Sequence, residues 1–464
     1  MRRNLIRCAV AAILVAGCSR SPAPGDTGGP AFAISDVSVI DVETGEIAPG
    51  RTVIVRGSRI AEIVDARATL PAGTKVVSGA GGFLIPGLWD MHTHSAAAAS
   101  RELPTFLSLG VTGIRNMHTS VDTALQLVAA IKRQLAAGTI VGPRFIANGA
   151  IVDGPRPAQR GSVPIGSPEA AVRIVDSLAA GGADFIKVYN LIPRESYFAL
   201  LDAAKRRGIA VVGHVPVTVR AAEAAAAGQR SIEHFDGLDF ACSTREDSIR
   251  AEFLAAPSRE AWYRRGAQLT ASFSAEQCAS AIAAFAQQRT WQVPTLAVAW
   301  AEAFGDSLLI DSAAMSSLAP DVAEQWRGMT ADTTHGPDPA APERFTQAKT
   351  LVRLMRAARV PMLAGTDVGN PFVVPGWSLH HELALLVDAG LTPLEALQTA
   401  TLNPARFLEA TDSLGTVAPG KLADLVLLDA NPLADIRNSR TIRGVMINGR
   451  WHDRAALDAL AADH

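Results

Sequence analysis

Residues 86–94 read PGLWDMHTH, a short apolar run that ends in two histidines. Successive side chains of a strand point to opposite faces, so His92 and His94 would project from the same face. Two imidazoles that share a face suit a transition-metal ion. A His-x-His pattern is a weak signal by itself, because many such pairs are ordinary polar pairs. The rest of the chain must therefore show whether further ligands join them.

Strand–helix alternation continues from this stretch to about residue 409. Apolar runs alternate with alanine-rich stretches, which predicts βαβ units and a parallel sheet. The expected strands include residues 110–116, 145–148, 185–189, 210–214 and 361–367, and the expected helices include residues 121–136, 168–180 and 221–227. Eight such units would make a TIM barrel of about 250 residues. Because this region is longer, we expect insertions at residues 239–290 and 301–343.

Polar residues lie at or near the ends of several expected strands. Lys187 lies in the run FIKVY, and His214, His234 and Asp367 each end or follow an apolar run. The interval from His94 to Lys187 is 93 residues, which fits three strand–helix units. Barrel active sites are built at the carboxyl ends of the strands. We therefore expect these residues at one rim, on strands one, four, five, six and eight.

The composition excludes several classes of protein. The 464 residues carry 43 Lys and Arg against 45 Asp and Glu, a net charge of −2, and 48% of them are hydrophobic. Such a hydrophobic content excludes a disordered chain, and the near-neutral charge argues against nucleic-acid binding by bulk charge. Cys242 and Cys278 form either a disulfide or two buried free thiols, because the sequence gives no distance between them.

The first residues have the pattern of an export signal. Three arginines precede an apolar run that is too short to span a bilayer as a mature helix. The run ends in VAGC, which resembles a bacterial lipoprotein signal, and an ordinary secretory signal is the alternative. We expect a signal peptide over residues 1–17, lipidation of Cys18 and a flexible tether over residues 18–31. The lipid anchor would hold the protein in the bacterial cell envelope, and Ser19 favours the periplasmic face of the outer membrane.

Taken together, these motifs resemble the amidohydrolase superfamily, in its imidazolonepropionase-like and prolidase-like branch. The resemblance rests on PGLWDMHTH, on the later Lys, His and Asp positions, and on residues 391–428, which include LTPLEALQTATLNPARFL and GTVAPGKLADLVLL. It implies an α/β fold with a (β/α)8 TIM barrel over residues 86–409. Both ends of the chain are strand-rich, and the resemblance implies that residues 32–85 and 410–464 form an accessory β-sandwich.

The resemblance also implies a centre with two divalent metal ions, for which zinc is the expected metal. His92, His94 and Asp367 would hold one ion, while His214 and His234 would hold the other. Lys187 would bridge both ions as an Nζ-carboxylate. Two such ions activate a bridging water as hydroxide, and Asp367 would accept its proton and pass it to the leaving amine.

Three further residues are candidates for contact with a small-molecule substrate. Tyr189 shares a strand face with Lys187 and could stabilise a developing oxyanion. His118 follows the expected second strand, and His380 lies near a helix start beyond the eighth. One feature departs from the prolidase-like pattern, which often has a histidine after the third strand. Asn148 or Asp153 would take its place here, which puts dipeptidase specificity in doubt.

These observations favour a metal-dependent hydrolase of an amide-like C–N bond, in an N-acyl amino acid, a dipeptide or a cyclic amide. A mononuclear imidazolonepropionase-like hydrolase or deaminase is the first alternative, and a bridging carboxylate on Lys187 would argue against it. A non-catalytic envelope lipoprotein that binds metal or ligand is the second.

Overall fold

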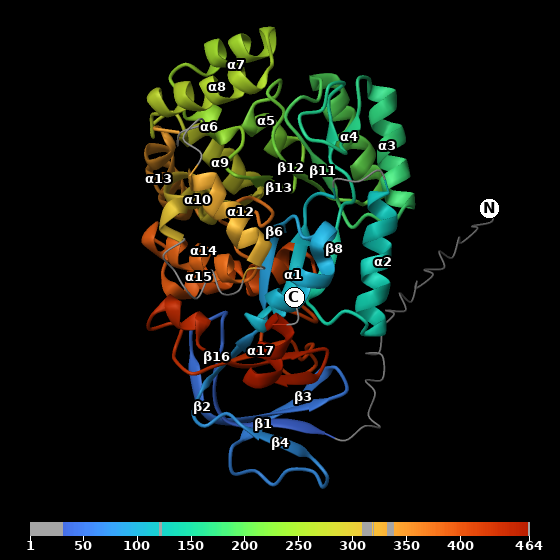
Figure 1. Ribbon diagram of the computed structural model, residues 1–464, viewed down its shortest axis with the longest axis vertical. Coiled ribbons are helices and arrows are strands. Elements are labelled where there is room, and N and C mark those ends of the chain that lie inside the picture. The colour runs from blue at the N-terminus through green and yellow to red at the C-terminus, as the bar shows by residue number, and fades with distance from the viewer. Residues whose placement is uncertain (1–30, 120–122, 309–317, 319, 332–337, 463–464) are drawn as a thin grey trace, which may run out of the picture.

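The computed structural model describes residues 31–119, 123–308, 318, 320–331 and 338–462. Strands from both chain ends form one end of the molecule, and helices surround parallel strands in the remainder (Figure 1). The expected signal peptide, Cys18 and all of the expected tether but Ala31 lie outside the described residues. Within those residues, no helix has the length and apolar character needed to cross a membrane.

The strand-rich end is a single mixed sheet to which both ends of the chain contribute. Its order is β17-β16-β15-β5-β1-β2-β3, with β4 paired to β1. The central junction is antiparallel, where Val426 of β15 lies opposite Ile85 of β5. Alternating apolar residues such as Ile34, Val53 and Leu425 form the core of this sheet. Its strands are β1 (Phe32–Ile40), β2 (Ile47–Arg56), β3 (Arg59–Asp65), β4 (Lys75–Ser78), β5 (Phe83–Pro86), β15 (Leu425–Leu428), β16 (Ile442–Ile447) and β17 (Arg450–Asp453).

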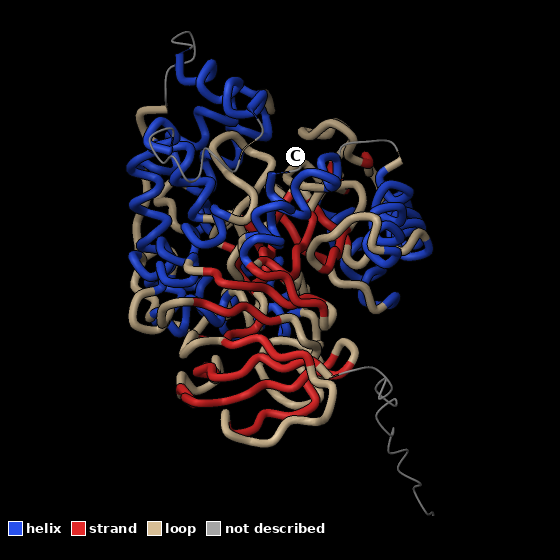
Figure 2. The backbone as a smooth tube through the Cα atoms, turned by 60° about the horizontal axis from the view of Figure 1, so that its bottom comes forward, coloured by secondary structure: helices blue, strands red, loops and turns tan. Residues whose placement is uncertain are grey.

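Two parallel sheets form the middle of the chain. One has the order β6-β7-β8, and the other β10-β9-β11-β12-β13-β14. Figure 2 shows these strands enclosed by helices. Their bounds are β6 (Leu88–Thr93), β7 (Val111–Asn116), β8 (Arg144–Ala147), β9 (Val152–Asp153), β10 (Val163–Pro164), β11 (Ile186–Val188), β12 (Val211–Gly213), β13 (Ser231–Glu233) and β14 (Trp291–Val293).

Residues 361–368 connect the two parallel sheets. The amide of Gln292 in β14 donates to the carbonyl of Pro361, and the amide of Met91 in β6 donates to the carbonyl of Ala364, each at 2.9 Å. On the opposite side, the amide of Asp184 donates to the carbonyl of Ala147 at 3.0 Å. The structure thus confirms an α/β fold with parallel sheets and a mixed sheet from both ends. The arrangement is consistent with the predicted barrel.

Helices cover the outside of the parallel strands. Several have the expected capping residues: Ser167 accepts a hydrogen bond from the amide of Ala170 at the start of α3, and Gly138 ends α2 with positive φ. The helices are α1 (Ala99–Ser108), α2 (Ala124–Ala137), α3 (Pro168–Ala180), α4 (Arg194–Arg207), α5 (Ala221–Ala226), α6 (Leu238–Ala241), α7 (Glu246–Ala255), α8 (Arg259–Ala271), α9 (Ala279–Gln288), α10 (Leu296–Leu308), α12 (Pro320–Ala331), α13 (Ala341–Ala357), α14 (Trp377–Asp388), α15 (Pro393–Thr399), α16 (Leu402–Phe407) and α17 (Arg454–Ala462).

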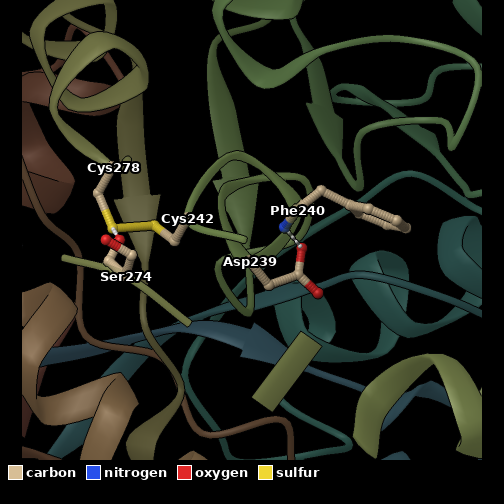
Figure 3. The surroundings of a disulfide bond; sticks show 5 residues. All are labelled: Asp239, Phe240, Cys242, Ser274 and Cys278. Carbon is tan, nitrogen blue, oxygen red and sulfur yellow. Dashed lines mark hydrogen bonds between the residues drawn. A yellow bond between two sulfur atoms is a disulfide. The ribbon is translucent and has the colours of Figure 1, made fainter. Parts of the chain in front are cut away.

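A disulfide closes the segment that follows β13. The sequence leaves the state of Cys242 and Cys278 open, and the structure pairs them with their Cα atoms 4.3 Å apart (Figure 3). The bond joins the end of α6 to the start of α9 and encloses α7 and α8. These two helices lie at the end of the molecule opposite the mixed sheet (Figure 1).

Candidate metal centre

The predicted ligands converge at the carboxyl ends of the parallel strands. His92 lies in β6 and Lys187 in β11, while His214 and His234 directly follow β12 and β13. Asp367 follows the segment that pairs with β14 and β6, and its own amide donates to the carbonyl of His92 at 2.8 Å. Strand order alone therefore brings residues from distant parts of the chain to one rim.

The side chains in this cluster lie close enough to share metal ions. Asp367 Oδ1 lies 2.9 Å from His94 Nε2 and 3.3 Å from His92 Nε2, and its Oδ2 lies 3.9 Å from His234 Nε2. Lys187 Nζ lies 3.3 Å from His92 Nε2. The His214 ring follows, with its centroid 5.1 Å from that of His234. Ligand atoms of His92, His94 and Asp367 all lie within 4.8 Å of one another.

Hydrogen bonds to Nδ1 orient three of the imidazoles. His92 Nδ1 contacts Glu233 Oε2 at 3.0 Å, and His234 Nδ1 contacts Thr295 Oγ1 at 2.7 Å. A third contact of 2.8 Å joins His214 Nδ1 to Asn190 Oδ1. Metal-binding histidines commonly make such a bond with the nitrogen that does not bind the ion. Nε2 is therefore the nitrogen that each ring offers to a metal.

Arg115 supports the centre from the buried interior between the parallel strands. Its Nη2 lies 2.9 Å from Glu233 Oε2, and its Nε donates to the carbonyl of Met91 at 2.6 Å. Both Arg115 and Glu233 have no exposed surface. A buried ion pair is stable only when its remaining hydrogen-bonding groups are satisfied, and Ser231 helps by donating to Glu233 Oε1 at 2.6 Å. The chain of contacts from Arg115 through Glu233 holds the ring of His92 in place.

Backbone strain marks two of the predicted ligands. His234 has a φ of 57° and Asp367 a φ of 64°, a region that L residues rarely occupy. Such conformations cost free energy and persist where the surrounding structure imposes them, often at functional sites. The preceding residue, Thr366, donates a hydrogen bond from its hydroxyl to Asp90 Oδ2 at 2.6 Å, which holds the backbone at Asp367 against β6.

Burial and neighbouring charges shift the ionisation of these groups in the direction that metal binding requires. Burial lowers the pKa of Lys187 to about 8, although Asp367 and Glu233 oppose the shift. Burial also lowers the pKa of His234 to about 3. Burial alone would raise the pKa of Asp367, but His234, His94 and Lys187 outweigh it and hold that pKa below its usual value. Neutral imidazoles beside an ionised carboxylate are the protonation states of metal ligands.

The donor set fits a transition-metal ion. Asp367 Oδ1 is buried between two imidazoles, 2.9 Å from His94 Nε2 and 3.3 Å from His92 Nε2. His92, His94 and Asp367 together form a metal-binding group of the His/His/Asp type. Imidazole and carboxylate ligands suit zinc and several neighbouring metals.

A cavity of about 540 Å³ opens over the ligands. Tyr189 lines it with its ring 4.2 Å from that of His214, and its hydroxyl accepts a hydrogen bond from Gln159 at 3.0 Å. His118 also lines it, with Nε2 3.1 Å from the carbonyl of Arg160. Burial raises the pKa of Tyr189 to about 12, so its hydroxyl remains a hydrogen-bond donor at neutral pH.

Three other predicted residues lie outside this cavity. His380 is buried, with Nδ1 at 2.9 Å from Ser439 Oγ and Nε2 at 2.9 Å from the carbonyl of Leu109. Its ring therefore joins α14 to the segments around it and does not reach a substrate in the cavity. Asn148 donates to the carbonyl of Ala150, and Asp153 accepts from loop amides. Gln159, which lies in the connection between β9 and β10, lines the cavity.

Sequence reasoning did not single out the supporting residues. The sequence offers one signal for these supporting residues, which is that polar residues lie in or beside short apolar runs. They are Arg115, Asn190, Glu233 and Thr295. Their partners lie as far as 141 residues away in the chain, as in the contact between His92 and Glu233.

Residues 83–452 match the Amidohydrolase family over most of the chain. The chain belongs to this family. An adenine deaminase from Rubrobacter xylanophilus is 27% identical over 432 residues, which cover 89% of this amidohydrolase and 56% of that protein. An imidazolonepropionase from Pyrobaculum arsenaticum is 44% identical over 87 residues, 18% of this chain and 21% of that protein. The matched part thus spans 56% of the length of the adenine deaminase and 21% of the length of the imidazolonepropionase.

Solved structures show the same fold over nearly the whole chain. Bottromycin amidohydrolase superposes with a TM-score of 0.71 and 28% identity, covering 94% of this amidohydrolase and 90% of that chain. A Xaa-Pro dipeptidase with bound methionine superposes with a TM-score of 0.67 and 19% identity. The match covers 91% of this amidohydrolase and 100% of that chain. The likeness to the dipeptidase concerns the fold alone.

Proposed function

We propose that this amidohydrolase hydrolyses an amide-like C–N bond of a small molecule at a centre of two divalent ions, with zinc as the expected metal. The observation that carries the proposal is the cluster of His92, His94 and Asp367, with Lys187, His214 and His234 beside it. Family membership adds support, because the cluster lies within the matched residues.

The residues divide the work of hydrolysis among themselves. When bound here, divalent ions would lower the pKa of a coordinated water and polarise the substrate carbonyl. Asp367 is placed to accept a proton from the attacking water and to pass it to the leaving amine. Tyr189, which lines the cavity beside His214, donates a hydrogen bond to the carbonyl oxygen as negative charge develops.

Lys187 completes the centre as an Nζ-carboxylate. Its neutral amine attacks CO2, so that an N–C bond forms, one C–O π bond opens and a proton is released. The support is positional: Nζ is buried and lies 3.3 Å from His92 Nε2, where an amine would compete with a cation and a carboxylate would bind it. Lys187→Ala should lose activity and regain part of it when acetate is added. Lys132→Ala on the surface should behave as the parent enzyme.

The decisive experiment combines metal analysis with a substrate panel. Purified enzyme should contain about two divalent ions per chain, lose activity with a chelator and regain it with zinc. Among N-acyl amino acids, dipeptides and cyclic amides, at least one class should be hydrolysed, and Asp367→Asn should lower its kcat by roughly 10²–10⁴-fold. Fully metallated protein that hydrolyses no member of the panel would favour the non-catalytic alternative.

A second candidate is a one-metal deaminase or cyclic-amide hydrolase. The similarity to adenine deaminases and to an imidazolonepropionase favours it. A metal content near one per chain, with full activity in Lys187→Ala, would support this candidate over the two-metal hydrolase.

A further inference from the structure

The helical segment enclosed by the disulfide contributes one wall of the cavity. Trp262, Arg265 and Leu269 of α8 line the same cavity as the predicted metal ligands. The segment begins beside Asp239, whose Oδ1 accepts a hydrogen bond from the amide of Phe240 at 2.8 Å (Figure 3). Residues on α8 can therefore contact the part of a substrate that extends away from the reacting bond.

Arg265 is a buried cation that is not hydrogen-bonded to a carboxylate of the described residues. Its side chain lines the cavity although the residue is 7% exposed, and its Nε and Nη1 have no hydrogen-bond partner. No ion pair to Arg265 forms within the described part of the chain. Nearby arginines differ, because Arg344 pairs with Asp338 at 2.6 Å and Arg250 with Glu246 at 2.8 Å. A buried guanidinium normally requires such partners.

Asp236 and Asp239 lie near Arg265, whose charge acts to lower the pKa of both carboxyl groups, but their hydrogen bonds go to other groups. Asp236 contacts Asn190 at 2.8 Å and His214 at 3.2 Å, and it accepts a bond from the amide of Val215. Asp239 is bonded to the amide of Phe240. Neither carboxylate supplies the bidentate partner that a guanidinium favours.

Aromatic rings lie close to this guanidinium. Its Cζ lies 3.6 Å from the ring centroid of Trp262 and 5.2 Å from that of Phe240. Stacking of this kind orients an arginine for planar recognition of a carboxylate. Nearby, Leu269, Phe273, Val298 and Phe345 line the cavity with apolar surface.

We propose that Arg265 is a specificity-determining residue that binds a carboxylate of the substrate, while the apolar wall receives a hydrophobic group. This inference rests on the proposed hydrolase function and narrows its substrate class to small amides that carry both groups. A charge-assisted contact of this kind changes affinity by roughly 10–100-fold.

Binding can be measured without turnover. Calorimetry on the metallated enzyme would compare 4-phenylbutanoate with 5-phenylpentan-2-one, a neutral ketone of similar shape that has no hydrolysable bond. We expect the carboxylate to bind roughly 10–100-fold more tightly. Arg265→Met, which retains apolar contact with Trp262, should abolish this preference, and Arg265→Lys should restore part of it. Arg264→Met is the matched control, because Arg264 lies one position away and is exposed.

A kinetic comparison separates this inference from the proposed function. Glutaryl-4-nitroanilide and pentanoyl-4-nitroanilide share the scissile bond and differ in one carboxylate. Arg265→Met should lower kcat/KM for the first, mainly through KM, and leave the second within about threefold, with thermal unfolding confirming that the variant is folded. If the parent and Arg265→Met hydrolyse each substrate at the same rate, Arg265 does not determine specificity and the hydrolase function stands. If neither these substrates nor any member of the amide panel is hydrolysed while 4-phenylbutanoate still binds through Arg265, the hydrolase proposal fails instead. No binding of 4-phenylbutanoate, or a preference that persists in Arg265→Met, would overturn the inference.

Discussion

Glu233 connects the candidate metal centre to the buried interior between the parallel strands. Its carboxylate lies 3.0 Å from His92 Nδ1 and 2.9 Å from Arg115 Nη2. Each of these groups is buried, so none can exchange its partner for bulk water. The orientation of His92 therefore depends on a residue that cannot itself reach a metal in the cavity.

We predict that Glu233→Gln weakens metal binding by roughly 10–100-fold, because the amide is a poorer acceptor for His92 and leaves Arg115 without a counter-charge. Chelator competition with zinc would measure the change. The matched control is Glu395→Gln, which breaks an exposed ion pair with Arg356. It should cost at most about 1 kcal/mol of stability and leave metal affinity unaltered. Equal metal affinity in Glu233→Gln and the parent would refute this supporting role.

Among the elements, α14 meets α10 through a buried acid. Glu382 Oε2 accepts a hydrogen bond from the amide of Ala297 at 2.7 Å, near the start of α10, while its Oε1 has no hydrogen-bond partner. Burial raises the pKa of Glu382 to about 8. The folded protein therefore favours the protonated acid, whereas the unfolded chain ionises it near its usual value of about 4.3.

The sign of the resulting pH dependence follows from this raised pKa. The folded state binds the extra proton between about pH 4.3 and pH 8, so the contribution of Glu382 to stability is present below that window and is lost as pH rises through it. We predict that the free energy of unfolding of Glu382→Gln, followed by urea denaturation, depends less on pH in this window than that of the parent. Glu62→Gln, at an exposed position of β3, should show the same pH dependence of unfolding as the parent. If the free energy of unfolding of Glu382→Gln depends on pH as steeply as that of the parent, another group is responsible.

The disulfide acts on a whole helical segment. It joins residues 36 positions apart and closes the chain around α7 and α8. In the chain-entropy description, a loop of this length stabilises the folded state by about 4 kcal/mol. We predict that thermal unfolding of the parent shifts to lower temperature when a reductant is added. A Cys242→Ser/Cys278→Ser variant should already unfold at the lower temperature and should not respond to reductant.

The molecule as a whole combines a mixed sheet from both chain ends with parallel strands that hold the centre (Figure 1). The sheet lies at the end opposite α7 and α8, so the apolar junction between β5 and β15 stabilises the fold away from the cavity. We propose that the N-terminal segment attaches this catalytic body to the bacterial envelope through a lipidated Cys18.

This proposal predicts the fate of the protein in fractionated cells. The parent should sediment with membranes and dissolve in detergent, because acyl chains on Cys18 would anchor it. Cys18→Ser should move the protein to the soluble fraction or retain an uncleaved signal. Cys278→Ser, in which Cys18 is intact, should remain with membranes. Parent protein found in the soluble fraction would contradict lipid anchoring and favour a secretory signal.

The sequence by itself determined the parts that depend on local pattern and side-chain chemistry. Alternating apolar residues predicted the strands of the mixed sheet, and βα alternation predicted the parallel strands. The positions of polar residues at strand ends, such as His92 and Asp367, predicted that they meet at one rim, and the resemblance to the amidohydrolase superfamily implied that they bind metal. Parallel strands bring their carboxyl ends together whatever the exact contacts, so this expectation needed no coordinates.

Only the tertiary structure decided which side chains meet. It paired Cys242 with Cys278, joined Glu233 to His92, and left two guanidinium nitrogens of Arg265 without a hydrogen-bond partner. It also placed His380 between Ser439 and Leu109, away from the substrate cavity. These contacts join residues up to 271 positions apart, and they depend on strand register and helix packing, which no local pattern encodes.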